Sequence, residues 1–411
     1  MRPRLGGVFW LLFCGESASA VGTGASAVAL PLVSFQDSGD VRAAGLISTA
    51  LSLGIVAARL PAGLLADRHE RRTILLWCNA VGALVLGALA ALQASHAAHL
   101  ALLLVAAFLL GAVGSTLAPA ENVAVRNVVD ADLLPRALAL LQGRSAFAMI
   151  AGPLAGGALL KADAAWVFGA DAMTYLTAAC CAFLLPSNMG PVSEEKTPLG
   201  ATVEGLRFLW RSPLLRYGAL NATVLNLVFN GLLIVIIAST QSAGAGEVSV
   251  GVQTAALGAG ALVGALVAAP VARRLPVRHA IVGATAVIAA ALLGFAVVRT
   301  TWGSALMLAL AAAAGPVITV VVSAAQMRIT PLRLQGRVHS GSGFLAQAIA
   351  PLGPVLAGAS AHQFGMTSTV FGAAGLVLLL AVVGAFITTH HAGHSDDLSH
   401  PEARSLEVRR G

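Results

Sequence analysis

One carboxyl group lies inside the first long apolar stretch of the chain. Glu16 is the only charged residue within residues 7–34. An ionised side chain at membrane depth is costly, so an acid there indicates a functional group by default. Ser19, Thr23 and Ser26 follow Glu16 at intervals of three or four residues, which places them on one helix face. We expect this face to line a central cavity, where Glu16 binds and releases a proton or another cation.

The fifth apolar stretch carries a basic side chain. Arg144 lies about two turns into residues 136–160. Pairing with Glu16, binding of an anionic substrate and closure of a gate by an ion pair are all open roles for it. Two other roles are equally open for Glu16. One is that of a purely structural ion-pair partner of Arg144, and the other is that of a solvated acid near the cytoplasmic end of its helix. Asp171, in the sixth stretch, is interpreted as a packing or capping residue.

A second polar stripe occurs in the seventh apolar stretch, residues 214–240. Thr223, Asn226 and Asn230 recur there at helical spacing, with Asn221 nearby. We expect this stripe to line the same central cavity as the stripe that begins at Glu16.

The composition indicates that these groups are held within a membrane. Of 411 residues, 57% are hydrophobic and 10% charged, and the mean hydropathy is +0.85. Soluble domains carry about a quarter charged residues, so this chain has too few to cover a water-exposed surface. A helix needs roughly 20 apolar residues to cross a bilayer, and the sequence predicts an all-α membrane protein with twelve transmembrane helices. The expected spans are residues 7–34, 42–65, 73–93, 98–120, 136–160, 164–186, 214–240, 247–272, 278–298, 302–325, 336–362 and 366–389.

The basic residues indicate how these helices are oriented. Of the 25 Lys and Arg residues, only Arg42, Lys161 and Arg299 fall in loops on the side opposite the termini, while Arg59 and Arg144 lie within helices. Lys and Arg are retained on the cytoplasmic side during insertion. Both termini are therefore expected in the cytoplasm, with the chain in the cell (inner) membrane of a bacterium.

The distribution of residue types excludes several other classes of protein. The net charge of +7 comes from short loops at alternate ends of apolar segments and forms no basic face for nucleic acid. No G-x-x-x-x-G-K-[ST] loop is present. We expect no cofactor, no metal, no nucleic-acid partner and no enzymatic activity. The cysteines have neither disulfide nor metal-ligand spacing and are interpreted as packing residues: Cys14, Cys78, Cys180 and Cys181.

The two halves of the chain repeat each other. One constant shift places Arg136 on Arg337, Pro153 on Pro354 and Gly157 on Gly358. Two bundles related by duplication, with a substrate path between them, form a recurrent transporter architecture. We expect an N-terminal six-helix bundle at 1–186, a cytoplasmic linker at 187–213, a C-terminal six-helix bundle at 214–389 and a disordered tail at 390–411.

The connection between the second and third apolar stretches is short and basic. Residues 63–72 read GLLADRHERR, which resembles the signature loop G-x-x-x-D-R-x-G-R-R of the major facilitator superfamily, with Glu70 in place of a glycine. The resemblance implies that Asp67 caps a helix of the second half, beginning near Gly336, and locks a cytoplasmic gate. Arg136 and Arg337 are assigned to the same gate. The residues that match the signature are Gly63, Asp67, Arg68, Arg71 and Arg72.

The block from Pro119 to Gly157 is more specific. It resembles the drug and siderophore exporter branch of that superfamily, which includes macrolide-efflux-like proteins and the enterobactin exporter. In the resembled antiporters, the G-P-x-x-G-G element of helix 5 holds the two bundles together when the outside gate is shut; ordinary packing of small residues is the alternative. The matching residues are Pro119, Asn122, Leu134, Pro135, Arg136, Gly152, Pro153, Gly156 and Gly157.

Together these features predict a secondary transporter with the major facilitator fold. The resemblance implies alternating-access export of amphipathic small molecules, such as a drug, natural product or siderophore, by proton antiport, with a role in antibiotic resistance. The expected partners are a small amphipathic substrate, protons and the lipid bilayer, and the chain is expected to act as a monomer. A narrow-specificity metabolite exporter or a proton-coupled importer is the alternative, and a membrane sensor or enzyme is a remote one.

Overall fold

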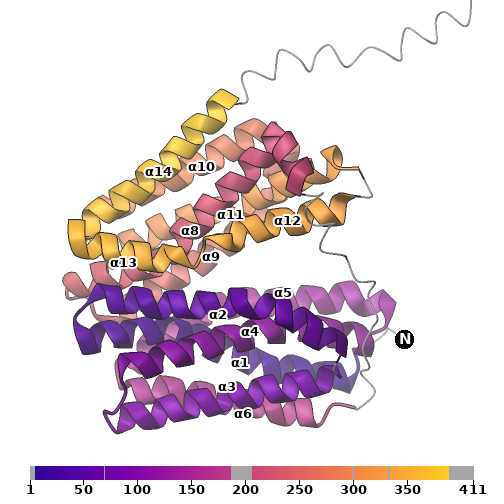
Figure 1. Cartoon of the computed structure of the whole chain (residues 1–411), viewed down its shortest axis with the longest axis vertical. Coiled ribbons are helices and arrows are strands. Elements are labelled where there is room, and N and C mark those ends of the chain that lie inside the picture. Colours follow the sequence, from indigo (N-terminus) through magenta and orange to yellow (C-terminus); the bar gives the residue numbers. More distant parts are fainter. Residues whose placement is uncertain (1–4, 69, 187–205, 299, 332–333, 388–411) are drawn as a thin grey trace, which may run out of the picture.

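In a computed structural model of the protein, long helices run side by side in two groups, one for each half of the chain (Figure 1). The structure describes all residues except 1–4, 69, 187–205, 299, 332–333 and 388–411, and only the backbone of 60–68 and 387. The predicted tail and most of the predicted linker therefore lie outside the described residues. Within them, twelve helices are long and apolar enough to cross a membrane, as the sequence predicts.

The first half forms six long helices whose ends have local causes. Gly39 adopts a φ of +66° and ends the first helix. The Asp163 carboxylate accepts a hydrogen bond of 2.7 Å from the backbone N–H of Ala165 and so caps the sixth. The elements are α1 (Gly7–Ser38), α2 (Val41–Arg68), α3 (Arg71–Ala94), α4 (Leu100–Val128), the 3-10 helix η1 (Ala131–Leu133), α5 (Leu134–Leu160) and α6 (Ala164–Phe183).

The second half repeats this arrangement with one helix in two pieces. Residues 206–211 are helical and lead into α8, and Leu209 among them packs into a small cluster with Leu215 and Val338. The elements are α8 (Pro213–Ser242), α9 (Gly246–Arg274), α10 (Val277–Val297), α11 (Thr301–Ile329), α12 (Gln335–Ala348), α13 (Leu352–Phe364) and α14 (Met366–Ile387).

Two helices differ most from the sequence prediction. The span predicted at 98–120 continues as α4 to Val128, because the helix extends beyond the apolar run and stops only where Val129 turns extended. The span predicted at 336–362 is interrupted between α12 and α13. Pro351 lies at this break, and proline has no N–H with which to continue the helical hydrogen bonds.

The two halves approach most closely at one end of the molecule. We call the end that holds residues 7 and 387 the terminal end, and the end that holds residues 39–40 and 243–245 the opposite end. In the half of the helices towards the opposite end, α5 packs against α9 and α2 packs against α13. The Nε2 of Gln36 also donates a hydrogen bond of 2.8 Å across the halves to Oε1 of Glu247. The halves are therefore joined at the opposite end.

These two contacts are built from equivalent residues. A Cβ added to Gly251 would lie 2.5 Å from the carbonyl oxygen of Pro153, and one added to Gly45 would lie 2.7 Å from that of Pro354. Only glycine permits this approach of backbone to backbone. Because Pro153 and Pro354 are the repeated prolines of the sequence, α5 against α9 and α13 against α2 form two copies of one contact. We call them the paired glycine contacts.

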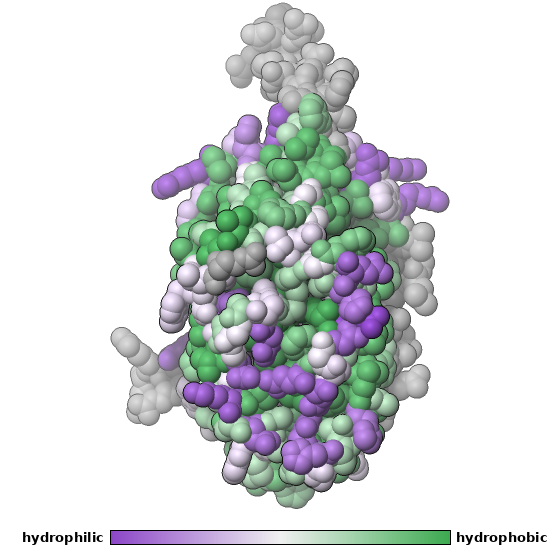
Figure 2. Space-filling model, turned by 90° about the vertical axis from the view of Figure 1, so that its left-hand side faces the viewer, coloured by the Kyte–Doolittle hydropathy of each residue, from purple (hydrophilic) through white to green (hydrophobic). Residues whose placement is uncertain are grey.

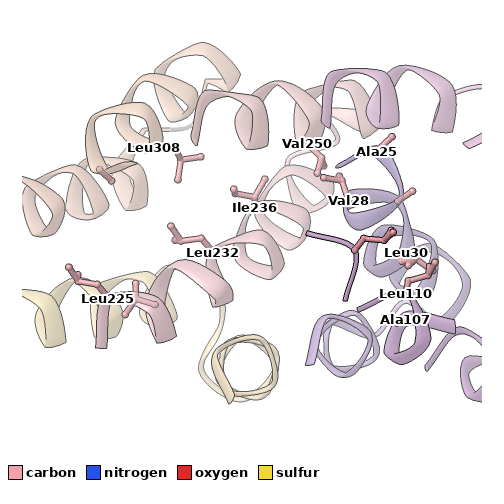
Figure 3. Close-up of a cluster of buried hydrophobic side chains, with 14 of the residues drawn as sticks. Ala25, Val28, Leu30, Ala107, Leu110, Leu225, Leu232, Ile236, Val250 and Leu308 are labelled. Atoms are coloured by element: carbon pink, nitrogen blue, oxygen red, sulfur yellow. The ribbon is translucent and has the colours of Figure 1, made fainter. Parts of the chain in front are cut away.

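A hydrophobic core runs through both halves, and apolar residues also cover the outside. Figure 3 shows side chains of this core from both halves, among them Val28 and Val250. Leu84, Leu266 and Trp302 are 72–77% exposed, which suits a surface that faces lipid. Figure 2 views the opposite end, where hydrophilic side chains lie over both halves among hydrophobic ones.

Candidate functional site

Glu16 is buried inside the first half of the chain. It is 7% exposed, and its Oε1 accepts a hydrogen bond of 2.8 Å from Nδ2 of the fully buried Asn79 on α3. A Cβ added to the neighbouring Gly15 would lie 2.9 Å from the Cβ of Cys181, so α6 closes the third side. Ser19 is 3% exposed one turn further along α1. Glu16 thus sits among α1, α3 and α6 with a neutral amide as its hydrogen-bond partner.

Arg144 forms an ion pair with Glu121 of α4. Both guanidinium Nη atoms donate to the two Glu121 carboxylate oxygens, the Nη2 to Oε2 bond measuring 2.6 Å. The two side chains are 11% and 8% exposed, and the Arg144 Cζ lies 6.0 Å from the centroid of the Phe13 ring. Phe13 precedes Glu16 by about one turn of α1. The charges of Glu121 and Arg144 both act on Glu16, although Arg144 bonds to Glu121.

Sequence reasoning missed Glu121. It treated the fourth span as ending at residue 120, which left Glu121 in a loop, whereas α4 continues to Val128. The sequence did contain a signal, because Glu121 is an acidic residue in a helix that continues past Pro119.

Asp171 closes a cavity within the first half. Its Oδ2 accepts a hydrogen bond of 2.6 Å from Ser26 Oγ, and its Oδ1 accepts one of 3.1 Å from Thr174 Oγ1. Beside them, Thr23 Oγ1 donates to the Tyr175 hydroxyl at 3.0 Å. All of these residues except Thr174 line a cavity of about 310 Å³ between α1, α2, α4 and α6. The structure therefore brings Thr23 and Ser26, two members of the predicted stripe, together with Asp171.

The asparagines of α8 are placed differently from one another. Asn221 is fully buried and donates to Thr285 Oγ1 at 3.1 Å. Asn226 and Asn230 each donate at 2.8 Å to a backbone carbonyl one turn earlier in their own helix. Asn226 also lines a second cavity, of about 410 Å³, in the second half. Glu247 is the only acidic residue in 213–387, so the buried carboxyl groups of the described chain are concentrated in the first half.

The predicted gate residues are described only in part. Gly63, Asp67 and Arg68 lie in α2, but their side chains are outside the described part of the structure. Arg71 is 2% exposed at the start of α3, and Arg72 Nη2 donates to the Phe183 carbonyl at 2.6 Å. The Arg72 guanidinium also stacks over the Phe183 ring, 5.4 Å from its centroid. Arg136 lies at the start of α5 and Arg337 at the start of α12.

The predicted helix-5 motif contacts both α1 and α9. Cβ atoms added to Gly152 and Gly156 would lie 2.8 Å from Gly24 Cα and 2.7 Å from the Ala25 carbonyl oxygen of α1. A Cβ on Gly157 would instead lie 2.7 Å from the Glu247 carbonyl oxygen of α9. Pro153 adds the contact with Gly251 described above. This motif therefore links the helix that carries Glu16 to the other half of the molecule.

A polar group at the opposite end also connects the halves. Asp40 forms an ion pair of 2.8 Å with Arg42 and lies 3.9 Å from His362 Nδ1 of α13. Hydrogen bonds from the Arg42 side chain and backbone N–H hold the pKa of Asp40 below its usual range.

Comparison with known proteins gives a consistent result. Residues 2–410 match the family MFS_3, described as transmembrane secretion effector. The multidrug efflux pump Tap of Mycolicibacterium fortuitum is 28% identical over 94% of this chain and 97% of its own length. Tap of Mycobacterium tuberculosis (strain ATCC 25618 / H37Rv) is 26% identical over 90% of each chain.

Solved structures share the fold at low sequence identity. The nucleoside transporter NupG superposes with a TM-score of 0.77 at 12% identity, covering 93% of this chain and 99% of its own. A bacterial homologue of the lysosomal transporter Spinster gives 0.68 at 15% identity, covering 98% and 100%. Since the family match spans nearly the whole sequence and the twelve helices are present, the chain belongs to the transmembrane secretion effector family of major facilitator transporters.

Proposed function

We propose that the protein exports amphipathic small molecules by proton antiport, and that Glu16 carries the proton. The observation that supports this most is the position of Glu16: a buried carboxyl group with an amide partner, next to an ion pair that already occupies Arg144. Two relatives that align over most of the chain are named multidrug efflux pumps. A drug or natural product is the substrate class that these names favour, and antibiotic resistance would be the consequence.

The neighbours of Glu16 suggest how a proton affects the helices. With Glu16 protonated, the group contains one balanced ion pair, Glu121 with Arg144. Loss of the proton leaves a second carboxylate that repels Glu121 and competes for the same guanidinium. Burying an unpaired charge is strongly unfavourable, so α1, α4 and α5 are driven to a different arrangement. The other titratable groups that interact with Glu16 are Cys78 of α3 and Cys181 and Tyr175 of α6.

The contacts between the halves suggest an alternating-access cycle. If the basic loops face the cytoplasm, the terminal end is cytoplasmic and the opposite end is outside. The paired glycine contacts then close the outside, and the arrangement described here is open towards the cytoplasm. Because α5 touches both α1 and α9, movement of α1 on deprotonation of Glu16 has a direct route to the outer contact.

Residues of the signature loop are proposed to form the gate at the other end. In an outward-facing arrangement, Asp67 would meet the N-terminus of α12, where a carboxylate is favoured by typically 0.3–1 kcal/mol. Gly63, Arg68, Arg71 and Arg72 shape the loop on one side, and Arg136 and Arg337 lie on the facing elements. An Asp67→Asn variant that transports at the wild-type rate with unchanged gate accessibility would exclude this role.

The proposal can be tested by accumulation of dyes and antibiotics in pump-deficient cells. Wild-type protein should lower accumulation, and both a protonophore and Glu16→Gln should restore it. Asp132→Asn, which changes an exposed acid in η1 of the same half, is the matched control and should behave as wild type. Accumulation that rises with wild type would indicate an importer, and no change for any compound would favour a narrow metabolite exporter. In that case untargeted metabolomics of the same cells identifies the substrate.

We also propose where and in what form the protein acts. The protein would act as a monomer in the bacterial inner membrane with both termini in the cytoplasm. Cysteine labelling from outside at residue 40, and its absence at residue 130, tests the orientation directly.

A further inference from the structure

The cavity beside Asp171 lies within one half of the molecule, away from the contacts between the halves. Its volume is about 310 Å³, at the lower end of the range for small-molecule sites. Thr23 is exposed and Asp171 is 1% exposed, so the carboxylate forms the floor of a cavity that opens past the threonine. The remaining walls come largely from apolar residues of α2 and α4, including Leu51, Ile55 and Leu110.

The polar side of this cavity presents hydrogen-bond acceptors. A hydroxyl group has one proton, and Ser26 gives its proton to Asp171 while Thr23 gives its own to the Tyr175 hydroxyl. The Ser26 and Thr23 oxygens are therefore left as acceptors, while the hydroxyls of Ser115 and Tyr175 also line the cavity. The bond to a carboxylate also polarises Ser26 Oγ and makes it a stronger acceptor. A ligand that donates hydrogen bonds fits the side of the cavity formed by Ser26 and Thr23.

The carboxyl group of Asp171 also has no basic partner among the residues described around the cavity. Among the described residues, no Arg, Lys or His forms an ion pair with Asp171, whose partners are the hydroxyls of Ser26 and Thr174. A cation that enters the cavity would be separated from the Asp171 carboxylate by a single hydroxyl group. Charge interactions in these surroundings are screened less than in water. Metal ions prefer a nearly complete shell of oxygen ligands, which the hydrocarbon side of this cavity does not provide.

We propose that this cavity binds the protonated amine of an organic cation, with the amine N–H groups donating to Ser26 and Thr23 and the apolar part packing against α2 and α4. The carboxylate of Asp171 supplies the counter-charge. The inference names the substrate class of the exporter proposed above, and it rests on that function for its physiological meaning. It assigns to Asp171 a binding role that packing alone does not require.

The test compares two ligands of one skeleton on purified protein in lipid nanodiscs. Isothermal titration calorimetry measures binding of 2-phenylethylammonium and of neutral 2-phenylethanol, with empty nanodiscs as the blank. Wild-type protein should bind the ammonium at least about tenfold more tightly than the alcohol. Asp171→Asn should abolish this preference by weakening the ammonium alone. Equal binding of the two ligands by wild type, or an unchanged preference in Asp171→Asn, would overturn the proposal.

A second variant keeps the test informative if Asp171→Asn does not fold. Gly114 of α4 lines the cavity, and a Cβ added there meets no atom within 4 Å. Gly114→Leu should therefore fill the cavity without disturbing Asp171 and weaken binding of both ligands. Gly87→Leu is the control, since that glycine of α3 also has open space but does not line the cavity. Ammonium binding that survives Gly114→Leu would place the site elsewhere.

Failure of this inference is distinguishable from failure of the proposed function. Binding is measured without transport, and export is measured in cells with neutral as well as cationic compounds. If neutral compounds are exported but 2-phenylethylammonium does not bind, only the cavity proposal is contradicted. If ammonium binding depends on Asp171 but no compound is exported, the export proposal is contradicted and the binding site is supported.

Discussion

Three buried carboxyl groups in the first half differ chiefly in their partners. Glu121 faces a guanidinium, Glu16 an amide and Asp171 two hydroxyls. A guanidinium partner balances the carboxylate charge, whereas an amide or a hydroxyl only hydrogen-bonds to it. This difference is why we assign Glu121 to holding Arg144. Glu16, beside that ion pair, is assigned to carrying a proton, and Asp171, which lines a cavity, to binding a cation.

The Glu121 and Arg144 pair should show strong energetic coupling. Glu121→Gln leaves a nearly buried guanidinium without its counter-charge, which we expect to cost about 3 kcal/mol. The double variant Glu121→Gln with Arg144→Gln should cost less than the two single variants summed, by about 1 kcal/mol or more. Thermal unfolding in nanodiscs measures all four proteins. Strictly additive effects would show that the ion pair is not formed.

Asp40 provides a control for the pH dependence of transport. Its pKa lies below the usual range because of hydrogen bonds from Arg42. The carboxylate therefore stays ionised as the pH falls and loses its charge only in stronger acid. Asp40→Asn should therefore leave the shape of the transport profile between pH 5 and about 8 unchanged. Glu16→Gln should flatten the same profile. A profile that shifts with Asp40→Asn would assign the titration to the opposite end.

Periodicity found some of these residues and missed others for physical reasons. Glu16 and its stripe were recognised because an acid in an apolar run stands out in the sequence itself. Asp171 was interpreted as a packing or capping residue from its position in the sixth span. Its contact with Ser26 joins residues 145 apart, which no local pattern reveals. Glu121 was not named as a partner of Arg144, since it had been placed outside the helix.

At the scale of helices, α5 has contacts that make it a mechanical link. Its glycines and proline place backbone against backbone on α1 and on α9. The repeat in the sequence indicated that Pro153 and Pro354 are equivalent, but the partners α9 and α2 could be identified only in three dimensions. The predicted start of α6 coincides with the cap at Asp163, whereas α1 runs four residues past its predicted end. The prediction was also poor where α4 outlasts its apolar run and where the helix breaks at Pro351.

The paired glycine contacts predict two equivalent variants. Gly251→Val and Gly45→Val each force a side chain into a backbone carbonyl 2.5–2.7 Å from the new Cβ and should separate the halves at the opposite end. Spin labels at residues 161 and 245, on a protein without its native cysteines, should report a longer distance for both.

Gly283→Val is the control for these variants, since the glycine in α10 has open space around it. It should leave the distance between the labels unchanged. An increase for only one of the two glycine variants would contradict the equivalence of the contacts.

For the whole molecule, the sequence predicted the helix count, the all-helical class and the repeat, because hydropathy and length determine them. The end at which the halves meet was not predictable, since both ends carry suitable small residues and the choice depends on the balance between two packed arrangements. That balance is what a proton on Glu16 is proposed to shift.

The most direct test of the account is substrate-driven proton movement in proteoliposomes that contain a pH-sensitive dye and purified protein. Addition of an exported organic cation to one side should move protons in the opposite direction with wild-type protein and with Asp132→Asn. The proton signal should vanish with Glu16→Gln. Substrate movement without a proton signal, or a signal that persists in Glu16→Gln, would contradict proton antiport through Glu16.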